Sequence, residues 1–153
     1  MNLKLDWYLK RFEDLSVEEL YELLRLRSEV FVVEQRCNFM DMDNKDQKCY
    51  HLLGRKDHKL LAYARIVPPG LSYEFPSIGR ILVSGEGRGM GFGVSLLEMS
   101  ISTVEKLYGK TTIRIGAQLY LEKFYGSFGF FRSSSVYLED EIEHIEMTRP
   151  GVK

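Results

Sequence analysis

The sequence predicts one domain, spanning residues 1–153, of mixed α/β (α+β) class with a largely antiparallel sheet. Three observations support this class. The 153 residues are 44% hydrophobic and 28% charged, which is typical of a globular domain with a sizeable core. Strand-like and helix-like segments follow one another in the mixed order β-α-β-β-β-α-β-α-β-β. No internal repeat, low-complexity tract or linker divides the chain.

The first helix is expected to begin after Ser16. Glu19, three residues later, completes a capping box, in which each side chain hydrogen-bonds the backbone of the other residue. Leu20, Leu24 and Phe31 then predict the buried face of this helix. The strands expected around it lie at residues 4–9, on either side of a turn at Asp57 and His58 within residues 49–67, and at residues 77–83.

The second half of the chain predicts two helices and three strands. A long helix is indicated by apolar residues with spacings of 3, 4, 3 and 4, closed by Gly109: Val94, Leu97, Ile101, Val104 and Tyr108. A second helix is expected at residues 119–128, with Leu121, Phe124, Tyr125 and Phe128 on one side. The remaining strands are expected at residues 111–117, 130–138 and 142–148.

Composition argues against several classes of protein. The formal net charge of −1 disfavours a general nucleic-acid binder, which would carry a basic excess. No apolar stretch is long enough to predict a membrane span, and the N-terminus has no uninterrupted apolar region of a secretion signal. Cys37 and Cys49 form no disulfide framework and are interpreted as small buried side chains. We therefore expect a cytoplasmic protein.

Five glycines alternate along the loop between a predicted strand and the long helix: Gly85, Gly87, Gly89, Gly91 and Gly93. Neither the dinucleotide pattern G-x-G-x-x-G nor the P-loop pattern fits this segment. A strand, a glycine loop and a helix can nevertheless aim backbone N–H groups at one anion, with the helix dipole behind them. From this loop alone, a phosphate site and a flexible connection are equally supported.

Two motifs in this order resemble those of the GNAT superfamily of N-acetyltransferases. The segment "VSGEGRGMGFG" resembles motif A, R/Q-x-x-G-x-G/A, with Arg88, Gly91 and Gly93 at its defined positions. The segment "AQLYLEKFYGSFGF" resembles motif B, although Gln118 replaces the usual Asn and Leu121 the usual Ala. The segments "LRSEVFVVEQ", "YARI" and "EIEHIEM" extend the resemblance to the ElaA-like branch over nearly the whole chain.

The resemblance implies a fold, a cofactor and a reaction. The fold would be a twisted mixed sheet, mainly antiparallel, of about seven strands with about four helices, splayed to admit acetyl-CoA. The reaction would be acetyl transfer to an amine in a ternary complex; a binding module without turnover is the alternative. The chain could also be a homodimer. The implied acetyl-CoA-binding residues are Ile81, Leu82, Val83, Arg88, Gly89, Met90, Gly91, Phe92, Gly93, Gln118 and Tyr125.

Acetyl transfer needs a proton donor for the thiolate and a proton acceptor for the amine. The resemblance implies Tyr125 as the donor; a core aromatic is the alternative interpretation. Glu34 is one candidate base. It lies seven residues after Arg27 on the same predicted helix face, so a structural ion pair with Arg27 is the alternative. His144 in the last strand is the second candidate, with a purely structural histidine as its alternative.

Two acidic loops predict the acceptor. The GNAT resemblance implies that an acceptor, either a small molecule or a peptide, enters between the loop after the first helix and the loop joining the last strands. The first loop carries Asp41, Asp43 and Asp46, and we interpret Asp41 and Asp43 as substrate-binding; the second carries Glu139, Asp140, Glu141 and Glu143. An acidic rim favours a cationic primary amine, unless both loops are merely solvated. The segment "DMDNKD" departs from a calcium loop, and the Cys and His spacings match no common zinc site, so no metal is expected.

Overall fold

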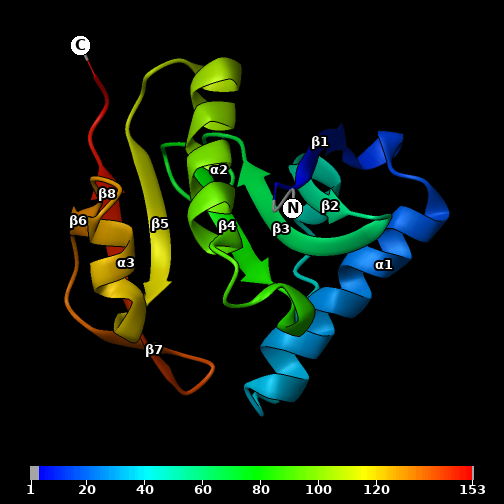
Figure 1. Ribbon diagram of the computed structural model, residues 1–153. Helices are drawn as coiled ribbons and strands as arrows, with labels where there is room; N and C mark the ends of the chain where they lie inside the picture. Colours follow the sequence, from blue (N-terminus) through cyan, green and yellow to red (C-terminus); the bar gives the residue numbers. More distant parts are fainter. Residues whose placement is uncertain (1–3, 153) are drawn as a thin grey trace.

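The computed structural model describes residues 4–152 and divides their strands between two sheets. The first has the order β1-β2-β3-β4, with all neighbours antiparallel: Asp6–Arg11, Tyr50–Lys56, Lys59–Val67 and Ser77–Val83. The second has the order β5-β8-β6, with β7 also paired to β8: Ile113–Gln118 (β5), Phe131–Arg132 (β6), Tyr137–Glu139 (β7) and Ile142–Arg149 (β8). Figure 1 shows β4 and β5 side by side where the sheets meet.

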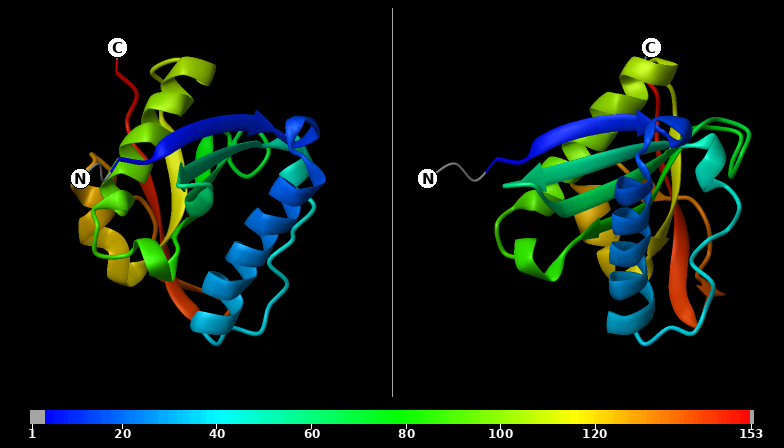
Figure 2. Two further views of the ribbon diagram at one scale, coloured as in Figure 1. Left: turned by 45° about the vertical axis from the view of Figure 1, so that its right-hand side comes forward. Right: turned by 90° about the vertical axis from the view of Figure 1, so that its right-hand side faces the viewer.

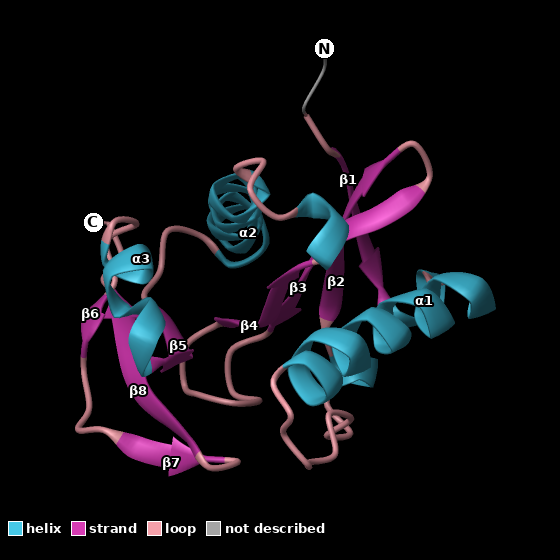
Figure 3. Cartoon of the chain, turned by 60° about the horizontal axis from the view of Figure 1, so that its bottom comes forward, coloured by secondary structure: helices cyan, strands magenta, loops and turns pink. Residues whose placement is uncertain are grey.

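Three α-helices cover the sheets in the described part of the chain: α1 (Val17–Ser28), α2 (Phe92–Tyr108) and α3 (Glu122–Gly126). In Figure 3, α1 lies on one face of the first sheet and α2 on the opposite face, and α3 lies beside β6 of the second sheet. The first helix continues into a π-helical turn, Glu29–Glu34, a distortion often found at functional sites. Short 3₁₀ turns occur at Phe12–Asp14, Asp46–Lys48, Gly85–Gly87 and Leu119–Leu121.

Two apolar cores explain why the central strands are hydrophobic on both faces. Adjacent side chains of a strand point to opposite faces, so Leu52 packs in the core beneath α2 and Leu53 in the core beneath α1. Along β3, Ala62 and Ala64 face the first core and Tyr63 the second. The first core also joins the two sheets, because side chains of β5 and β8 pack into it.

The predicted fold class is confirmed, with local corrections. The capping box is present: Glu19 N–H donates to Ser16 Oγ at 3.0 Å, and Ser16 N–H to Glu19 Oε1 at 2.9 Å. The fully buried face of α1 lies beside the predicted stripe, on Leu23, Leu26 and Arg27. The first strand begins two residues later than expected.

The segment after α2 differs more from the prediction. The helix expected at residues 119–128 is a 3₁₀ turn followed by the five-residue α3. The single strand expected at residues 130–138 is divided into β6 and β7. Between them, Ser133 N–H donates to Glu146 O, and Ser134 Oγ accepts from Glu146 N–H, both at 2.8 Å. These serines take over hydrogen bonds to β8 that a regular strand would make, so the ladder is interrupted there.

Candidate active site

A cavity of about 930 Å³ lies between β4 and β5. The strands are joined near their starts, where Arg114 N–H donates to Pro76 O at 3.2 Å. Residues of both strands line the cavity, among them Ile81, Leu82 and Val83 on β4 and Gly116 and Gln118 on β5. The two sheets therefore share a cleft rather than a continuous ladder.

A β-bulge shapes the β4 wall of this cleft. Tyr63 pairs with Leu82 and Arg65 with Gly79, so Arg80 and Ile81 together face one residue of β3. Arg80 has a φ of 51°, a left-handed conformation that is uncommon for a side chain other than glycine. A bulge leaves one residue unpaired and bends its strand, which makes backbone groups beside the cleft available to a ligand.

The glycine loop ends at an uncapped helix. Gly91 is the N-cap of α2, no side chain caps it, and the first turn contains no acidic residue. Gly89 and Gly91 have φ values of 82° and 79°, and a Cβ on either would meet no other protein atom. Their backbone conformation, not crowding by the chain, therefore requires glycine. Phe92 anchors the helix start, because its side chain is buried in the core.

Tyr125 lies on α3 with its side chain in the cavity wall. It is 6% exposed and makes edge-to-face contacts with Phe124 and Phe130. No residue within the described range 4–152 forms a hydrogen bond with its hydroxyl. Burial raises the pKa of the Tyr125 phenol, and nearby Tyr120 adds to this effect. The group therefore remains a neutral O–H donor.

The two candidate bases differ in how they are held. Glu34 Oε1 accepts from Arg88 Nη2 at 2.6 Å, and Arg88 Nε donates to Val83 O at 3.2 Å. His144 is 8% exposed; its Nδ1–H donates to Ile142 O at 2.8 Å, which leaves Nε2 3.4 Å from Glu139 Oε2. Both residues line the cavity, but of the two only Glu34 is hydrogen-bonded to an arginine.

The alternative interpretation of Glu34, a structural ion pair with Arg27, is wrong. Arg27 is buried, and its Nε donates to Asp41 Oδ2 at 2.8 Å and its Nη1 to Asp46 Oδ1 at 2.7 Å. The π-helical turn directs Glu34 toward Arg88 instead. Glu34 therefore belongs to the cleft and Arg27 to a separate cluster.

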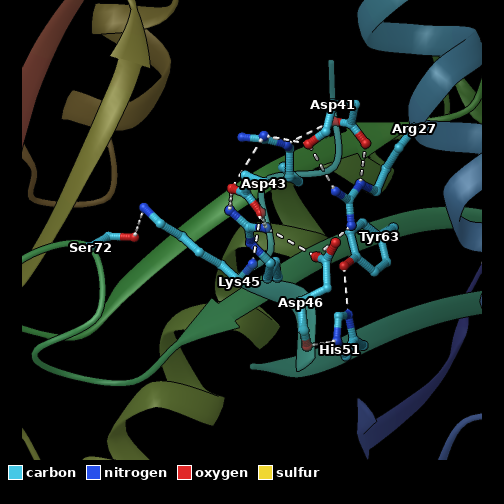
Figure 4. Close-up of polar contacts among 10 residues, drawn as sticks. Arg27, Asp41, Asp43, Lys45, Asp46, His51, Tyr63 and Ser72 are labelled. Atoms are coloured by element: carbon cyan, nitrogen blue, oxygen red, sulfur yellow. Dashed lines mark hydrogen bonds and ion pairs between the residues drawn. The ribbon is translucent and has the colours of Figure 1, made fainter. Parts of the chain in front are cut away.

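That cluster also corrects the expected acidic rim (Figure 4). Three arginines neutralise the first acidic loop through ion pairs of 2.7–3.5 Å: Arg27, Arg65 and Arg80 with Asp41, Asp43 and Asp46. Burial opposes ionisation of Asp43, yet the hydrogen bonds and charge of Arg65 outweigh it and hold its pKa below the ordinary value. Asp41 is buried and is not among the cavity-lining residues, whereas Asp43 lines the cavity from within the cluster.

The second acidic loop is exposed, as a rim requires. Asp140 and Glu141, with φ values of 51° and 67°, form the two-residue turn between β7 and β8. Figure 2 shows this hairpin beside the end of α1, and the Cys37 thiol donates to Asp140 O at 3.1 Å. Glu139 and Asp140 line the cavity.

The predicted acetyl-CoA residues fall into two groups. Ile81, Leu82, Val83, Arg88, Gln118 and Tyr125 line the cavity. The others do not line it and lie in the turn before α2 and in its first residues: Gly89, Met90, Gly91, Phe92 and Gly93. Gln118 Nε2 donates to Gln35 Oε1 at 3.2 Å, which links the end of β5 to the segment after α1.

Sequence reasoning missed Arg65, Arg80 and Lys45. An available signal was a charged residue inside an apolar strand, since "LAYARIV" and "GRILV" each contain one arginine. Cys37 and Cys49 are buried and free, as interpreted. Across residues 4–152, no three His, Cys, Asp or Glu side chains converge as a metal site would require. No helix in that range combines the length and apolar character needed to cross a bilayer.

Comparison with known proteins gives consistent matches. Residues 14–149 match the family described as "Acetyltransferase (GNAT) domain". Protein ElaA of Escherichia coli is 41% identical over 151 residues, covering 97% of this chain and 99% of ElaA. A UPF0039 protein of Synechocystis is 42% identical and covers 95% of each chain. Among solved structures, an acyl-CoA N-acyltransferase from Pseudomonas aeruginosa superposes with a TM-score of 0.91 at 42% identity, and E. coli ElaA with 0.88 at 40%; each covers 95% of this chain and 99% of the other.

Proposed function

This chain belongs to the GNAT acetyltransferase family, and from that premise we propose that it transfers an acetyl group from acetyl-CoA to a primary amine in a ternary complex. The observation that carries the proposal is the uncapped start of α2 at the edge of the cleft between β4 and β5. Backbone N–H groups of residues 89–93 would hold the pyrophosphate, since a helix N-terminus favours negative charge. Bound acetyl-CoA supplies the thioester carbonyl that the amine attacks.

The bulged wall and Tyr125 would stabilise the two charges that develop. As the amine nitrogen bonds to the carbonyl carbon, negative charge gathers on the carbonyl oxygen, and a backbone N–H near Val83 would donate to it. The nitrogen then loses its second proton to solvent, and the C–S bond breaks to leave the amide and a thiolate. The Tyr125 hydroxyl has no partner within residues 4–152, so it is available to donate its proton to this sulfur.

His144 is the better-placed base of the two candidates. An ammonium has no lone pair, so the acceptor must lose a proton before it attacks. The Nδ1–H bond to Ile142 O fixes the ring so that the lone pair of Nε2 remains available. An imidazolium formed there would be stabilised by Glu139. Glu34, in contrast, already accepts a 2.6 Å hydrogen bond from Arg88.

The exposed hairpin supports an acceptor whose reacting end arrives as a cation. Glu139 and Asp140 line the cavity, and no lysine or arginine within residues 4–152 pairs with either of them. Carboxylates at a cavity mouth raise the local concentration of ammonium groups. We include both small molecules and peptides among the proposed acceptors.

Tyr125→Phe tests this proposal. Removing one hydroxyl should lower kcat by roughly 10²-fold, because general acid catalysis contributes on that order. The affinity for acetyl-CoA, measured by calorimetry, should stay nearly unchanged. Release of CoA thiol with a panel of amines reports turnover, and Tyr108→Phe, the same change outside the cavity, is the matched control. Full activity in Tyr125→Phe would make Tyr125 a core aromatic, and binding of acetyl-CoA without any thiol release would favour a binding module.

A further inference from the structure

We infer that Lys45 and Ser72 form a subsite for a carboxylate of the acceptor, which makes the acceptor an amino acid or another small molecule with both an amine and a carboxylate. This inference rests on the proposed function, because it places the carboxylate at one end of the acceptor cavity and the amine at the other. Both residues line that cavity.

The charge balance of the neighbouring cluster leaves Lys45 without a role in it. Three arginines face three aspartates, so the cluster is neutral without a fourth cation. Figure 4 shows the Lys45 side chain extending away from Asp41 and Asp46 toward Ser72. The backbone of Lys45, in contrast, does contact the cluster, because Lys45 N–H donates to Asp43 Oδ1 at 3.2 Å. The ammonium is therefore held outside the ion pairs.

The partner of this ammonium is neutral. Lys45 Nζ donates to Ser72 Oγ at 3.1 Å, and no carboxylate within residues 4–152 lies within 4 Å of it. The side chain is half-buried, and a partly desolvated charge is costly without a counterion. Two ammonium N–H groups and the Ser72 hydroxyl proton remain available, which matches the acceptor-only chemistry of a carboxylate.

The backbone on both sides of the pair is well ordered by hydrogen bonds. Ser72 lies in a tight turn, in which Gly70 N–H donates to Tyr73 O at 2.7 Å. Lys45 follows the loop that the arginine cluster holds in place, and Lys48 N–H donates to its carbonyl at 3.0 Å. A subsite built from such segments keeps its geometry when a ligand binds, which limits the entropic cost of binding.

The other charges of the cavity wall indicate a dipolar ligand. Glu34 is paired with Arg88, and Arg65 and Arg80 are paired with aspartates. The unmatched charges are Lys45 on the first-sheet side and the carboxylates of Glu139 and Asp140 on the β7–β8 hairpin. A molecule that carries an amine toward His144 and a carboxylate toward Lys45 complements both.

Matched triplets of acceptors test the inference: a free amino acid, its carboxamide and the corresponding decarboxylated amine. With acetyl-CoA and wild-type protein, kcat/KM for the best amino acid should exceed that of its carboxamide by roughly 10-fold or more, as expected for one charged hydrogen-bonded contact. Lys45→Met should bring this ratio to about one through a higher KM, while kcat for the carboxamide is retained. Lys45→Arg should keep a preference, and Lys48→Met, an exposed lysine outside the cavity, should leave the ratio unchanged.

The outcomes separate this inference from the proposed function. Turnover with equal kcat/KM across each triplet, or a preference that survives Lys45→Met, would overturn the subsite while leaving the transferase intact. If no amine releases CoA thiol, the proposed function fails, and thermal denaturation with the same compounds then decides on the subsite. Amino acids should raise the melting temperature of the wild type but not of Lys45→Met; no shift with any of them would overturn it.

Discussion

The two acidic segments beside the cavity contain the same kind of side chain in opposite surroundings. Asp41 and Asp46, after α1, are buried and ion-paired with arginines. Asp140 and Glu141, in the β7–β8 turn, are exposed, and no lysine or arginine within residues 4–152 is ion-paired with them. The carboxylates of the first segment are held in ion pairs inside the fold, and those of the second are exposed to solvent.

The difference shows that burial determines whether a charged loop residue acts on stability or on approaching molecules. A buried carboxylate is stable only with compensating charge and hydrogen bonds, so its negative field is cancelled nearby. An exposed carboxylate keeps its hydration and its longer-range field, which salt screens. The first segment should therefore control stability, and the second should control encounter with the acceptor.

The largest effect on stability is expected when ion pairs of the buried acidic segment are removed. Asp46→Asn removes the charge that accepts from Arg27 at 2.7 Å and from Arg65 at 3.0 Å. The cluster is left with an uncompensated buried cation, so the free energy of unfolding should fall by about 3 kcal/mol or more. Urea denaturation measures this loss.

Asp140→Asn is the matched control in the exposed segment. Asparagine tolerates the positive φ of this turn, so the free energy of unfolding should change by less than about 0.5 kcal/mol. Equal losses for the two variants would show that burial does not separate the segments.

A smaller effect is expected from pH. Burial opposes ionisation of Asp46, but Arg27 and Arg65 outweigh it and lower its pKa. A carboxyl whose pKa is lower in the folded state contributes stability above its unfolded pKa of about 3.9, and this contribution is lost as pH falls. The deficit of Asp46→Asn relative to wild type should therefore shrink, by on the order of 1 kcal/mol, between pH 5 and pH 2.5. A deficit that stays constant over this range would mean that Asp46 is not ionised in the fold.

Local patterns in the sequence predicted much of the fold. Ser16 and Glu19 are three residues apart, and their capping box forms as predicted. The turn at Asp57 and His58 also forms between β2 and β3, because both residues take the left-handed conformation that such a turn needs. The division of residues 130–138 into two strands was not predictable locally, since it depends on hydrogen bonds from Ser133 and Ser134 to Glu146 in another strand.

The candidate site also contains features that local sequence patterns predicted and features that they did not. The glycine loop was recognisable because its residues are consecutive and lead into a helix. The partners of Arg27 could not be recognised in the sequence, because Asp41 and Asp46 follow 14 and 19 residues later, in a loop without periodicity. The nearer Glu34 was a reasonable choice only if the α-helical spacing continued, and the π-helical turn ends that spacing at Glu29.

The smallest effect is expected for the exposed acidic segment, in the salt dependence of kcat/KM. Asp140→Asn combined with Glu141→Gln removes two charges from the β7–β8 turn and leaves His144 and Glu139 in place. At low ionic strength kcat/KM for an amine acceptor should fall by roughly 2- to 5-fold, because the carboxylates steer ammonium groups toward the cavity. The difference from wild type should vanish near 0.5–1 M salt, where screening acts within roughly 3–4 Å, and kcat should not change.

Asp57→Asn is the control for this salt effect. It removes a charge from the other two-residue turn, with the same φ of 51° and away from the cavity, and should leave kcat/KM unaltered. An equal loss in Asp57→Asn would assign the effect to net charge, and a loss that persists in high salt would assign it to direct contact, because steering by the turn acts only through an unscreened field.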